Sequence, residues 1–268
     1  MKTLVIGDLH HKVKWVEKCI KEIKPDLTVF LGDYFDSFGD NPEITSETAK
    51  WLKESLETPK RVHLMGNHDM PYRFPMNFHL WCTGFTHEKA LVINEIISRA
   101  SWNKMMSFHW IDGWLLSHAG INHNFLHPLK GFDLGELRKF EQESLLKCNA
   151  ESNNPLFGCG YSRGGNYRCG GITWQDFDVD FVPIENVNQI VGHTPHPKVA
   201  VKLLLEGDND KEDAITCTWD EYLNVYKNET KKSLNLDIDT HRKHYAILEN
   251  GKVQIMNNKF ALENDFSQ

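Results

Sequence analysis

Short apolar segments recur along this 268-residue chain, and five of them end at a glycine or serine followed by an acid, an amide or an imidazole. Segments this short and this rich in Val, Ile and Leu are typical of buried β-strands. None of them approaches the ~18 consecutive apolar residues that a membrane-spanning helix needs. The first run, at residues 2–6, meets Asp8 almost at once, which disfavours a signal peptide. The sequence therefore predicts a folded globular protein that is neither secreted nor membrane-bound.

Strands and helices alternate through the first half of the chain, and hairpins follow. The predicted strands cover residues 2–6, 27–31, 61–64, 107–111, 114–117, 187–191, 234–238, 245–249 and 253–256. Helical periodicity predicts helices at residues 13–23, 46–56, 88–98 and 134–146. Asp112-Gly113 and Asn250-Gly251 lie between apolar runs and predict hairpin turns. This order favours mixed α/β sheets in a single domain over residues 1–268, with a surface insertion around 206–232.

The charge balance limits the classes of partner. Acidic residues outnumber basic ones, 37 against 30, which gives a net charge of −7. Binding to duplex nucleic acid draws most of its affinity from basic contacts to phosphate, so we expect no strong binding to duplex DNA. The six cysteines form no Cys-x-x-Cys pair, which excludes a zinc ribbon and a thioredoxin motif. We interpret them as reduced thiols of a cytoplasmic protein, and no feature of the sequence indicates an oligomeric state.

Acid, amide and imidazole side chains follow five of the predicted strands. The motifs are Gly7-Asp8-Leu9-His10, Gly32-Asp33-Tyr34-Phe35-Asp36, Gly66-Asn67-His68-Asp69, Ser117-His118-Ala119-Gly120 and Gly192-His193-Thr194-Pro195-His196. Because such strand ends meet at one edge of an α/β sheet, we expect these side chains to converge. One such motif alone is more often a turn or a structural histidine, but five in this order predict a shared site. Asp, Asn and His donors suit Mn²⁺, Fe or Zn²⁺ better than Ca²⁺.

The five motifs resemble those of the calcineurin-like metallophosphoesterases, especially the phosphoprotein phosphatase branch in its bacterial and phage forms. They span residues 7–196, and the closing strands fit the family as well, so the resemblance covers nearly the whole chain. It implies an α/β fold of two mixed β-sheets packed as a sandwich and flanked by helices. It also implies a dinuclear centre of two divalent metal ions, with Mn²⁺ favoured and Fe, Zn²⁺ or Ni²⁺ as alternatives.

The resemblance implies a role for each motif residue. The implied metal ligands are Asp8, His10, Asp33, Asn67, His118 and His193, with Asp33 bridging both ions. A hydroxide that bridges the two ions would attack phosphorus directly. His68 would protonate the leaving oxygen as general acid, and Asp36 would orient its imidazole. Asp69 is expected to fix the loop.

The chain departs from the family pattern where the phosphate is normally clamped. Protein phosphatases of this branch carry Arg-Gly after the second acid of Gly-Asp-x-x-Asp, and this chain has Ser37-Phe38 there. Phosphoryl transfer needs cationic or N–H donors on the phosphate oxygens, so another arginine is expected to substitute. Arg163 and Arg168 both lie in residues 157–171, which hold six glycines in fifteen positions, and Arg163 is the first candidate. Arg168 and Arg73 are the alternatives.

Two further residues have open interpretations. Some members of the superfamily have a Gly-His-x-His motif whose second histidine completes the first metal site. His196 comes three residues after His193 rather than two, so it is a possible extra ligand, with a loop imidazole as the alternative. Trp174 is interpreted as a core residue, and stacking on a base is its alternative role.

The sequence thus predicts a metal-dependent phosphoric ester hydrolase, similar to serine/threonine protein phosphatases, that hydrolyses a phosphomonoester or a phosphoanhydride. Its partner would be a phosphorylated substrate, either a phosphoprotein or a nucleotide. A dinucleoside polyphosphate or nucleotide hydrolase and a nucleic-acid-end phosphohydrolase are the alternatives. A non-catalytic binding scaffold is disfavoured because all six expected ligand positions are filled.

Overall fold

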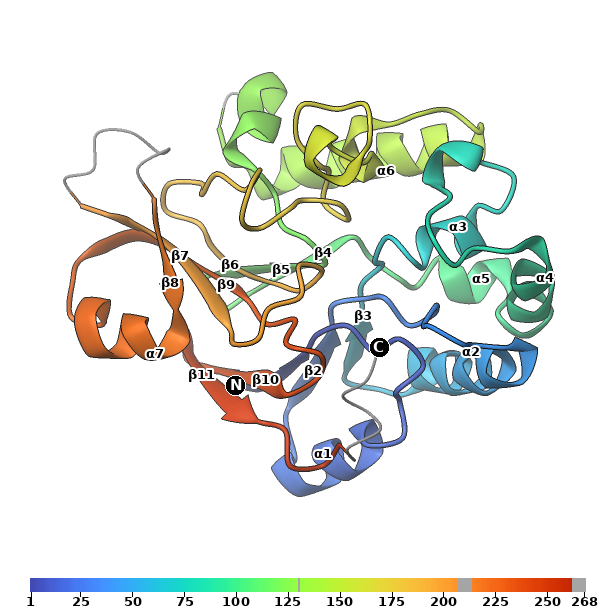
Figure 1. The fold of residues 1–268 in the computed structure, drawn as a ribbon, viewed down its shortest axis with the longest axis horizontal. Coiled ribbons are helices and arrows are strands. Elements are labelled where there is room, and N and C mark those ends of the chain that lie inside the picture. The colour runs from blue at the N-terminus through green and yellow to red at the C-terminus, as the bar shows by residue number, and fades with distance from the viewer. Residues whose placement is uncertain (130, 207–213, 262–268) are drawn as a thin grey trace.

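Two mixed β-sheets form the centre of the molecule in the computed structural model, which describes residues 1–129, 131–206 and 214–261 (Figure 1). The five-stranded sheet has the order β11-β10-β1-β2-β3, and the six-stranded sheet has the order β4-β5-β6-β9-β7-β8. The first sheet contains β1 (Lys2–Ile6), β2 (Leu27–Phe30), β3 (Arg61–His63), β10 (His244–Glu249) and β11 (Lys252–Asn257). The second contains β4 (Phe108–Ile111), β5 (Trp114–Ser117), β6 (Asn188–Val191), β7 (Ala200–Leu205), β8 (Ile215–Thr218) and β9 (Lys231–Asp237). The expected pair of mixed sheets is confirmed.

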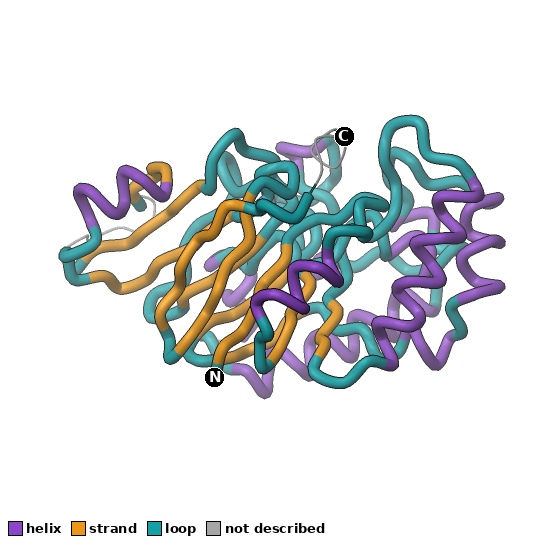
Figure 2. Tube along the Cα trace, turned by 90° about the horizontal axis from the view of Figure 1, so that it is seen from below, coloured by secondary structure: helices purple, strands orange, loops and turns teal. Residues whose placement is uncertain are grey.

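The continuous apolar run of β1 has a direct structural reason. Alternate side chains of a strand point to opposite faces. Leu4 and Ile6 pack in the core cluster that the helices cover, whereas Val5 packs in a second cluster with Ile190 and Leu236 of the other sheet. Both faces of β1 are therefore buried, one against helices and one against the second sheet. Figure 2 shows the strands side by side with the helices outside them.

Helices flank the sandwich, and most of them gather at one end of it (Figure 1). The helices are α1 (Val16–Ile23), α2 (Pro42–Glu57), α3 (Met70–Arg73), α4 (His87–Ile96), α5 (Arg99–Trp102), α6 (Leu134–Asn149) and α7 (Trp219–Glu221), and Tyr222–Tyr226 form a π-helical segment. Short 3-10 helices cover Phe78–Leu80, His123–Leu129, Pro155–Phe157 and Tyr161–Arg163. Helix α2 begins at Pro42 rather than at residue 46. The side chain of Asn41 caps it by accepting the N–H groups of Glu43 and Ile44.

The region predicted as a surface insertion, around 206–232, is partly integrated into the sheet. Residues 207–213 lie outside the described residues. In the part that follows, β8 pairs with β7 through contacts such as Val201↔Cys217, and α7 continues from it. The sequence prediction missed both β7 and β8.

No helix in the described ranges is long and apolar enough to cross a membrane.

The strand topology brings the motif residues together. Strands β1, β2 and β3 are mutually parallel, and so are β5, β6 and β9. Asp8, Asp33 and Asn67 follow the carboxyl ends of the first three, and His118 and His193 follow those of β5 and β6. The site is therefore assembled from both sheets at one edge of the sandwich.

Candidate metal centre

Two groups of potential metal ligands share one carboxylate. Asp8, His10 and Asp33 place ligand atoms within 4.8 Å of one another, and so do Asp33, His118 and His193. The Asp33 carboxylate lies 3.7 Å from Nε2 of His10 and 3.4 Å from Nε2 of His118. Asp33 thus stands between two ligand sets, which is the position that a bridging carboxylate needs.

Asn67 belongs to the second set. Its Oδ1 lies 3.0 Å from Nε2 of His118, and Nδ1 of His193 lies 3.2 Å from that same nitrogen. All six residues for which the resemblance implied a ligand role are therefore brought together by the fold.

Hydrogen bonds to backbone carbonyls fix the orientation of two imidazoles. Nδ1 of His10 lies 3.0 Å from the carbonyl of Phe35 and 2.6 Å from that of Asp36, so Nδ1 carries the proton. Nδ1 of His118 likewise donates to the carbonyl of Leu31 at 3.1 Å. Each Nε2 then presents a lone pair to the centre, where the carboxylate of Asp33 faces both rings and the side-chain oxygen of Asn67 faces that of His118. Lone pairs of oxygen and nitrogen that face one another fit a cation, and this set of ligand atoms suits a divalent transition ion.

The backbone holds these residues in sparsely populated conformations. His10, Asp33, Asp36 and His193 have φ values of 43°, 52°, 62° and 78°. Positive φ is costly for residues other than glycine, and such strain gathers at functional sites. Gly66 is required here by close approach, because a Cβ at that position would collide with the carboxylate of Asp33.

When no cation is bound, the buried carboxylates of the centre are desolvated and repel one another, which is energetically unfavourable. Burial, with the nearby charge of Asp239, raises the pKa of Asp8 well above its ordinary value, and burial with the charge of Asp8 does the same for Asp33. Burial lowers the pKa of His10 and of His118 to about 3, so both rings are neutral. A bound cation would offset the repulsion between the carboxylates and would use the neutral rings as ligands.

Asp69 fixes the loops that carry the ligands, as its motif position suggested. Its carboxylate accepts the N–H groups of Asp33 at 2.8 Å, Tyr34 at 3.0 Å and Gly66 at 2.8 Å. Burial raises the pKa of Asp69 to about 7 even though these bonds favour the ionised form. One side chain therefore ties the end of β2 to the end of β3.

His68 and Asp36 form a pair beside the ligand sets. Nδ1 of His68 lies 3.0 Å from Oδ2 of Asp36. The other oxygen of Asp36 accepts from the hydroxyl of Tyr72 at 2.5 Å and from Nζ of Lys89 at 2.6 Å. Burial opposes ionisation of Asp36, but the bonds from His68, Lys89 and Tyr72 together lower its pKa below the ordinary value. An ionised Asp36 can orient the imidazole so that Nε2 is left for a substrate.

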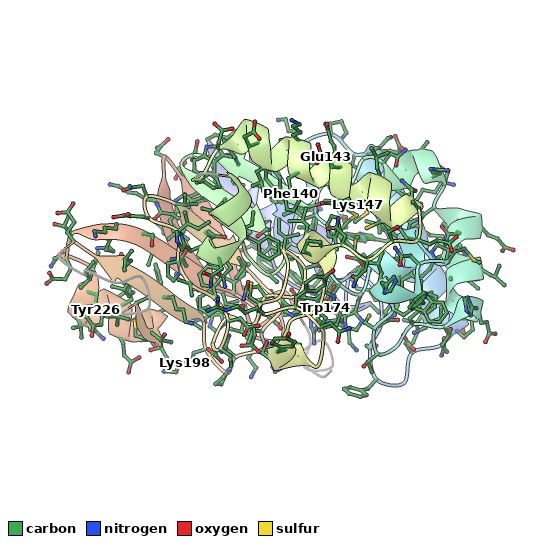
Figure 3. The ribbon with its side chains drawn as sticks, turned by 90° about the horizontal axis from the view of Figure 1, so that it is seen from above. Phe140, Glu143, Lys147, Trp174, Lys198 and Tyr226 are labelled. Atoms are coloured by element: carbon green, nitrogen blue, oxygen red, sulfur yellow. The ribbon has the colours of Figure 1, made fainter. Side chains whose placement is uncertain are left out.

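The candidate centre opens into a cavity of about 340 Å³. The predicted ligands Asp8, His10, Asp33, Asn67 and His193 line it together with Asp36 and His68. Phe38, Trp174 and Pro195 supply apolar walls, and the side chain of Phe38 is 83% exposed. Trp174 meets the ring of His193 edge-on at 5.6 Å and is labelled in Figure 3.

Arg163 also lines this cavity. Its Nε donates to Asp176 at 2.7 Å and its Nη2 donates to Thr194 at 3.1 Å. Thr194 directly follows His193, so the guanidinium is anchored to the same loop that carries a predicted ligand. The glycine-rich loop therefore delivers a cation to the cavity, as a phosphate clamp requires.

The two alternative arginines lie elsewhere. Arg168 lines a different cavity, together with Asp180 and Lys202, and Arg73, at the end of α3, lines a third one. The structure brings neither of them to the metal cavity, so the expectation that Arg168 contributes to a phosphate clamp there is corrected. Its support in the sequence was its place in the glycine-rich loop between two ligand motifs.

His196 is not placed with the ligand sets. Its Nε2 lies 3.9 Å from Asp237 and its Nδ1 lies 3.9 Å from Asp178. The backbone N–H of His196 donates to the carbonyl of Asp239, which holds the loop beyond His193. The loop-imidazole interpretation agrees with this position better than the extra ligand does.

Several residues that support the site do not stand out in the sequence. Tyr72 and Lys89, which bond Asp36, come from α3 and α4, and Asp176 holds Arg163. Lys89 is a buried cation on a helix face that also carries Ala90 and Ile93, which pack in the core. A lysine among apolar helix positions was the one available signal for it.

The chain matches a known protein family and is similar to several solved structures. The family described as calcineurin-like phosphoesterase matches residues 1–197. The solved structure of a cold-active protein tyrosine phosphatase superposes with a TM-score of 0.56 at 16% identity, covering 100% of this chain and 80% of that one. A protein serine/threonine phosphatase from Saccharomyces cerevisiae gives a TM-score of 0.47 at 13% identity, covering 98% and 81%. A metallophosphoesterase from Sphaerobacter thermophilus gives 0.43 at 13% identity, covering 96% and 87%.

The superposition on the first of these structures shows a shared fold. No curated protein matches the chain. Because the family match extends over most of the sequence, the chain belongs to the calcineurin-like phosphoesterases, a family of metal-binding hydrolases that act on phosphoesters.

Proposed function

We propose that this chain is a dinuclear metal-dependent phosphatase that hydrolyses a phosphomonoester or a phosphoanhydride, in the manner of serine/threonine protein phosphatases. The observation that carries this proposal is the sharing of Asp33 by two ligand sets, with the His68–Asp36 pair in the same cavity. The favoured ions are two Mn²⁺. The six free cysteines agree with a reducing, cytoplasmic setting.

The residues divide the work between binding and proton transfer. Asp8, His10 and Asp33 would hold one ion, and Asp33, Asn67, His118 and His193 would hold the other. Such a pair of ions supplies Lewis-acid charge for a phosphoryl oxygen and lowers the pKa of water.

The proton for the leaving group would come from His68. Nδ1 of His68 is bonded to Asp36, which leaves Nε2 free to carry a proton toward the leaving oxygen. Arg163 would bind a phosphoryl oxygen at the cavity wall.

A nucleotide substrate is the second candidate. Phe38, Trp174 and Pro195 give the cavity apolar walls beside the candidate centre. An aromatic base could stack on such walls, whereas a phosphoserine peptide has no need of them. A dinucleoside polyphosphate or the end of a nucleic acid would satisfy the same argument.

The test is an activity panel with protein loaded with Mn²⁺. The substrates are p-nitrophenyl phosphate, bis(p-nitrophenyl) phosphate, diadenosine tetraphosphate and a phosphoserine peptide. We expect about two Mn²⁺ per chain by elemental analysis, and hydrolysis that is lost when Asp33→Asn removes the shared carboxylate. Folded protein that binds one ion or none after loading would contradict the dinuclear proposal.

A His68→Asn variant tests the general acid separately. Turnover should fall by about 100- to 10,000-fold on substrates with poor leaving groups, because these need protonation. The loss should be much smaller on p-nitrophenyl phosphate, whose leaving group is stable as an anion, and metal content should persist. An equal loss on good and poor leaving groups would remove His68 from this role.

A further inference from the structure

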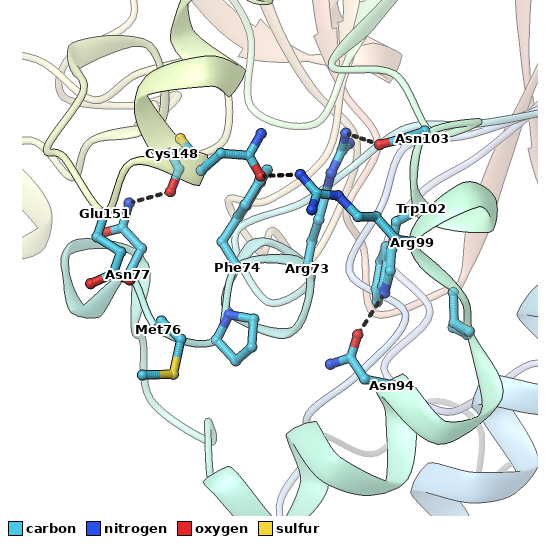
Figure 4. Close-up of a pocket in the computed structure, with 13 residues that line it drawn as sticks. Arg73, Phe74, Met76, Asn77, Asn94, Arg99, Trp102, Asn103, Cys148 and Glu151 are labelled. Carbon is cyan, nitrogen blue, oxygen red and sulfur yellow. Dashed lines mark hydrogen bonds between the residues drawn. The ribbon is translucent and has the colours of Figure 1, made fainter.

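A second cavity, of about 410 Å³, lies apart from the candidate metal centre. Its walls come from the end of α3 and the segment 74–77 that follows it, the end of α4, α5 and the end of α6, and its volume is in the range of small-molecule sites. None of the residues that line it lines the metal cavity. Figure 4 shows two arginines, Arg73 and Arg99, close together in it, with Asn94, Asn103 and Trp102 around them.

Arg73 is a half-buried cation whose bonded partners are neutral. Its Nη1 donates to the sulfur of Met65 at 2.9 Å, and its Nη2 donates to Oδ1 of Asn103 at 3.2 Å. The carboxylate whose charge most favours the protonated form of Arg73 is that of Glu141. Its two oxygens are bonded to other groups, the N–H of Ser107 and the guanidinium of Arg138. Burial lowers the pKa of Arg73 to about 10. A desolvated guanidinium without a carboxylate partner is costly, and an anion in the cavity would offset that cost.

Arg99 adds a second positive charge to the same cavity. It donates to Oδ1 of Asn149 at 3.3 Å, and across the described residues it makes no ion pair with a carboxylate. The two guanidinium groups repel each other, since the charge of Arg99 lowers the pKa of Arg73. Glu151 also lines the cavity, so the formal charge of the lining is one positive in excess, on a chain of net charge −7.

We propose that this cavity, called here the Arg73 cavity, binds a phosphate group. Guanidinium groups match phosphate with paired N–H donors, and two of them suit a dianion better than a monovalent carboxylate. Asn103 offers its side-chain N–H₂ as a further donor at the same wall. The group is free phosphate or the phosphate of a small organic molecule. The cavity has room for the organic part, because it is larger than one phosphate. The proposal does not depend on the function of the metal centre.

The experiment reads the arginine Nε–H resonances of ¹⁵N-labelled protein loaded with diamagnetic Zn²⁺, at low ionic strength. Signals of Arg73, Arg99 and Arg163 are assigned by their loss in single Arg→Gln variants. Inorganic phosphate should shift the Arg73 and Arg99 signals with one common midpoint. Arg163 lies in the other cavity and should report a midpoint of its own. Phenylphosphonate, which cannot be hydrolysed by the enzyme, forms the second arm, and tighter binding than free phosphate would identify an organic carrier.

Single substitutions then test the pocket. Arg99→Gln, at an exposed residue, should raise the midpoint read at Arg73 by at least tenfold, and Arg73→Lys should weaken binding severalfold because an ammonium cannot donate two parallel bonds. Glu151→Gln removes the opposing charge and should tighten binding. Lys147→Gln, at an exposed position of α6 labelled in Figure 3, removes the same charge as Arg99→Gln outside the cavity and should leave the midpoint unchanged.

Either of two results overturns the proposal. In one, the Arg73 and Arg99 signals stay fixed over the whole phosphate titration, whether or not the Arg163 signal shifts. In the other, Arg99→Gln and Lys147→Gln change the midpoint equally, which would mean that the overall charge of the protein, and not the cavity, determines the binding of phosphate.

Discussion

The guanidinium of Arg163 reaches the metal cavity from the glycine-rich loop at residues 157–171, which lies in the sequence between the predicted ligands His118 and His193. Asp176 and Thr194 hold two of its nitrogens, so its direction is set before any substrate binds. A donor fixed in this way loses little conformational entropy on binding phosphate, and it acts in a cavity where burial strengthens charge interactions. We therefore propose that Arg163 takes the role that the family's arginine has at the position of Ser37-Phe38, since all three residues line the same cavity.

Substitution of Arg163 therefore has a clear expected result. Arg163→Ala should lower kcat/KM by about 10- to 1,000-fold, and Arg163→Lys should restore only part, because a point charge cannot replace the planar fork. Arg168→Ala, in a different cavity, is the matched control and should have a small effect. Steady-state kinetics on p-nitrophenyl phosphate decide this. A silent Arg163→Ala would assign the clamp to another donor and would leave the metal ligands untouched.

At the scale of elements, β3 is held against α2 by a buried histidine. The ring of His63 stacks on Phe30 at 4.5 Å between centroids and is bonded at 2.9 Å both to the hydroxyl of Tyr34 and to that of Ser55 on α2. Burial, with the nearby charge of Arg61, lowers the pKa of His63 to about 3. The folded state therefore keeps this ring neutral while the unfolded chain takes up a proton near the ordinary value of 6.5.

This difference predicts how stability depends on pH. The contribution of His63 is complete above pH 6.5 and is lost as the pH falls toward 3, by up to about 1.4 kcal/mol per pH unit, because the unfolded state binds more protons. His63→Gln does not titrate, so its free energy of unfolding should fall less steeply over that range. Urea unfolding of both proteins at several pH values measures this. Parallel curves would show that His63 is not a neutral buried ring.

The sequence predicted the elements that carry the site better than the contacts between them. Runs such as Leu27–Phe30 are predictable as buried strands because the apolar pattern lies within the run itself. The polar residue at the end of each strand is visible in the same stretch of sequence. Tyr72 and Lys89 escaped prediction because their partner, Asp36, is distant in the sequence and only tertiary packing joins them. Strand β8 escaped as well, because its half-exposed residues Ile215–Thr218 show no buried apolar run.

At the scale of the whole molecule, the candidate centre joins the two sheets. Asp8, Asp33 and Asn67 come from the five-stranded sheet, whereas His118 and His193 come from the six-stranded one. The sheets also share an apolar core through Val5, Val29 and their partners. A bound metal would add a polar link at the edge where buried carboxylates repel each other.

Metal binding should therefore stabilise the entire fold and not only its active-site loops. An ion that binds the folded chain alone adds about 2.7 kcal/mol at 100 times its Kd, so Mn²⁺ should raise Tm and EDTA should lower it. Asp33→Asn should abolish most of this metal-dependent shift. Without metal, the same variant should unfold at the temperature of the wild type or above it, because burial and the charge of Asp8 disfavour an ionised carboxylate at Asp33. Asp220→Asn, at an exposed carboxylate, should retain the full shift. Calorimetry with and without Mn²⁺ measures the Tm of the wild type and of both variants. If the metal-free Asp33→Asn variant melts well below the metal-free wild type, Asp33 stabilises the fold by itself.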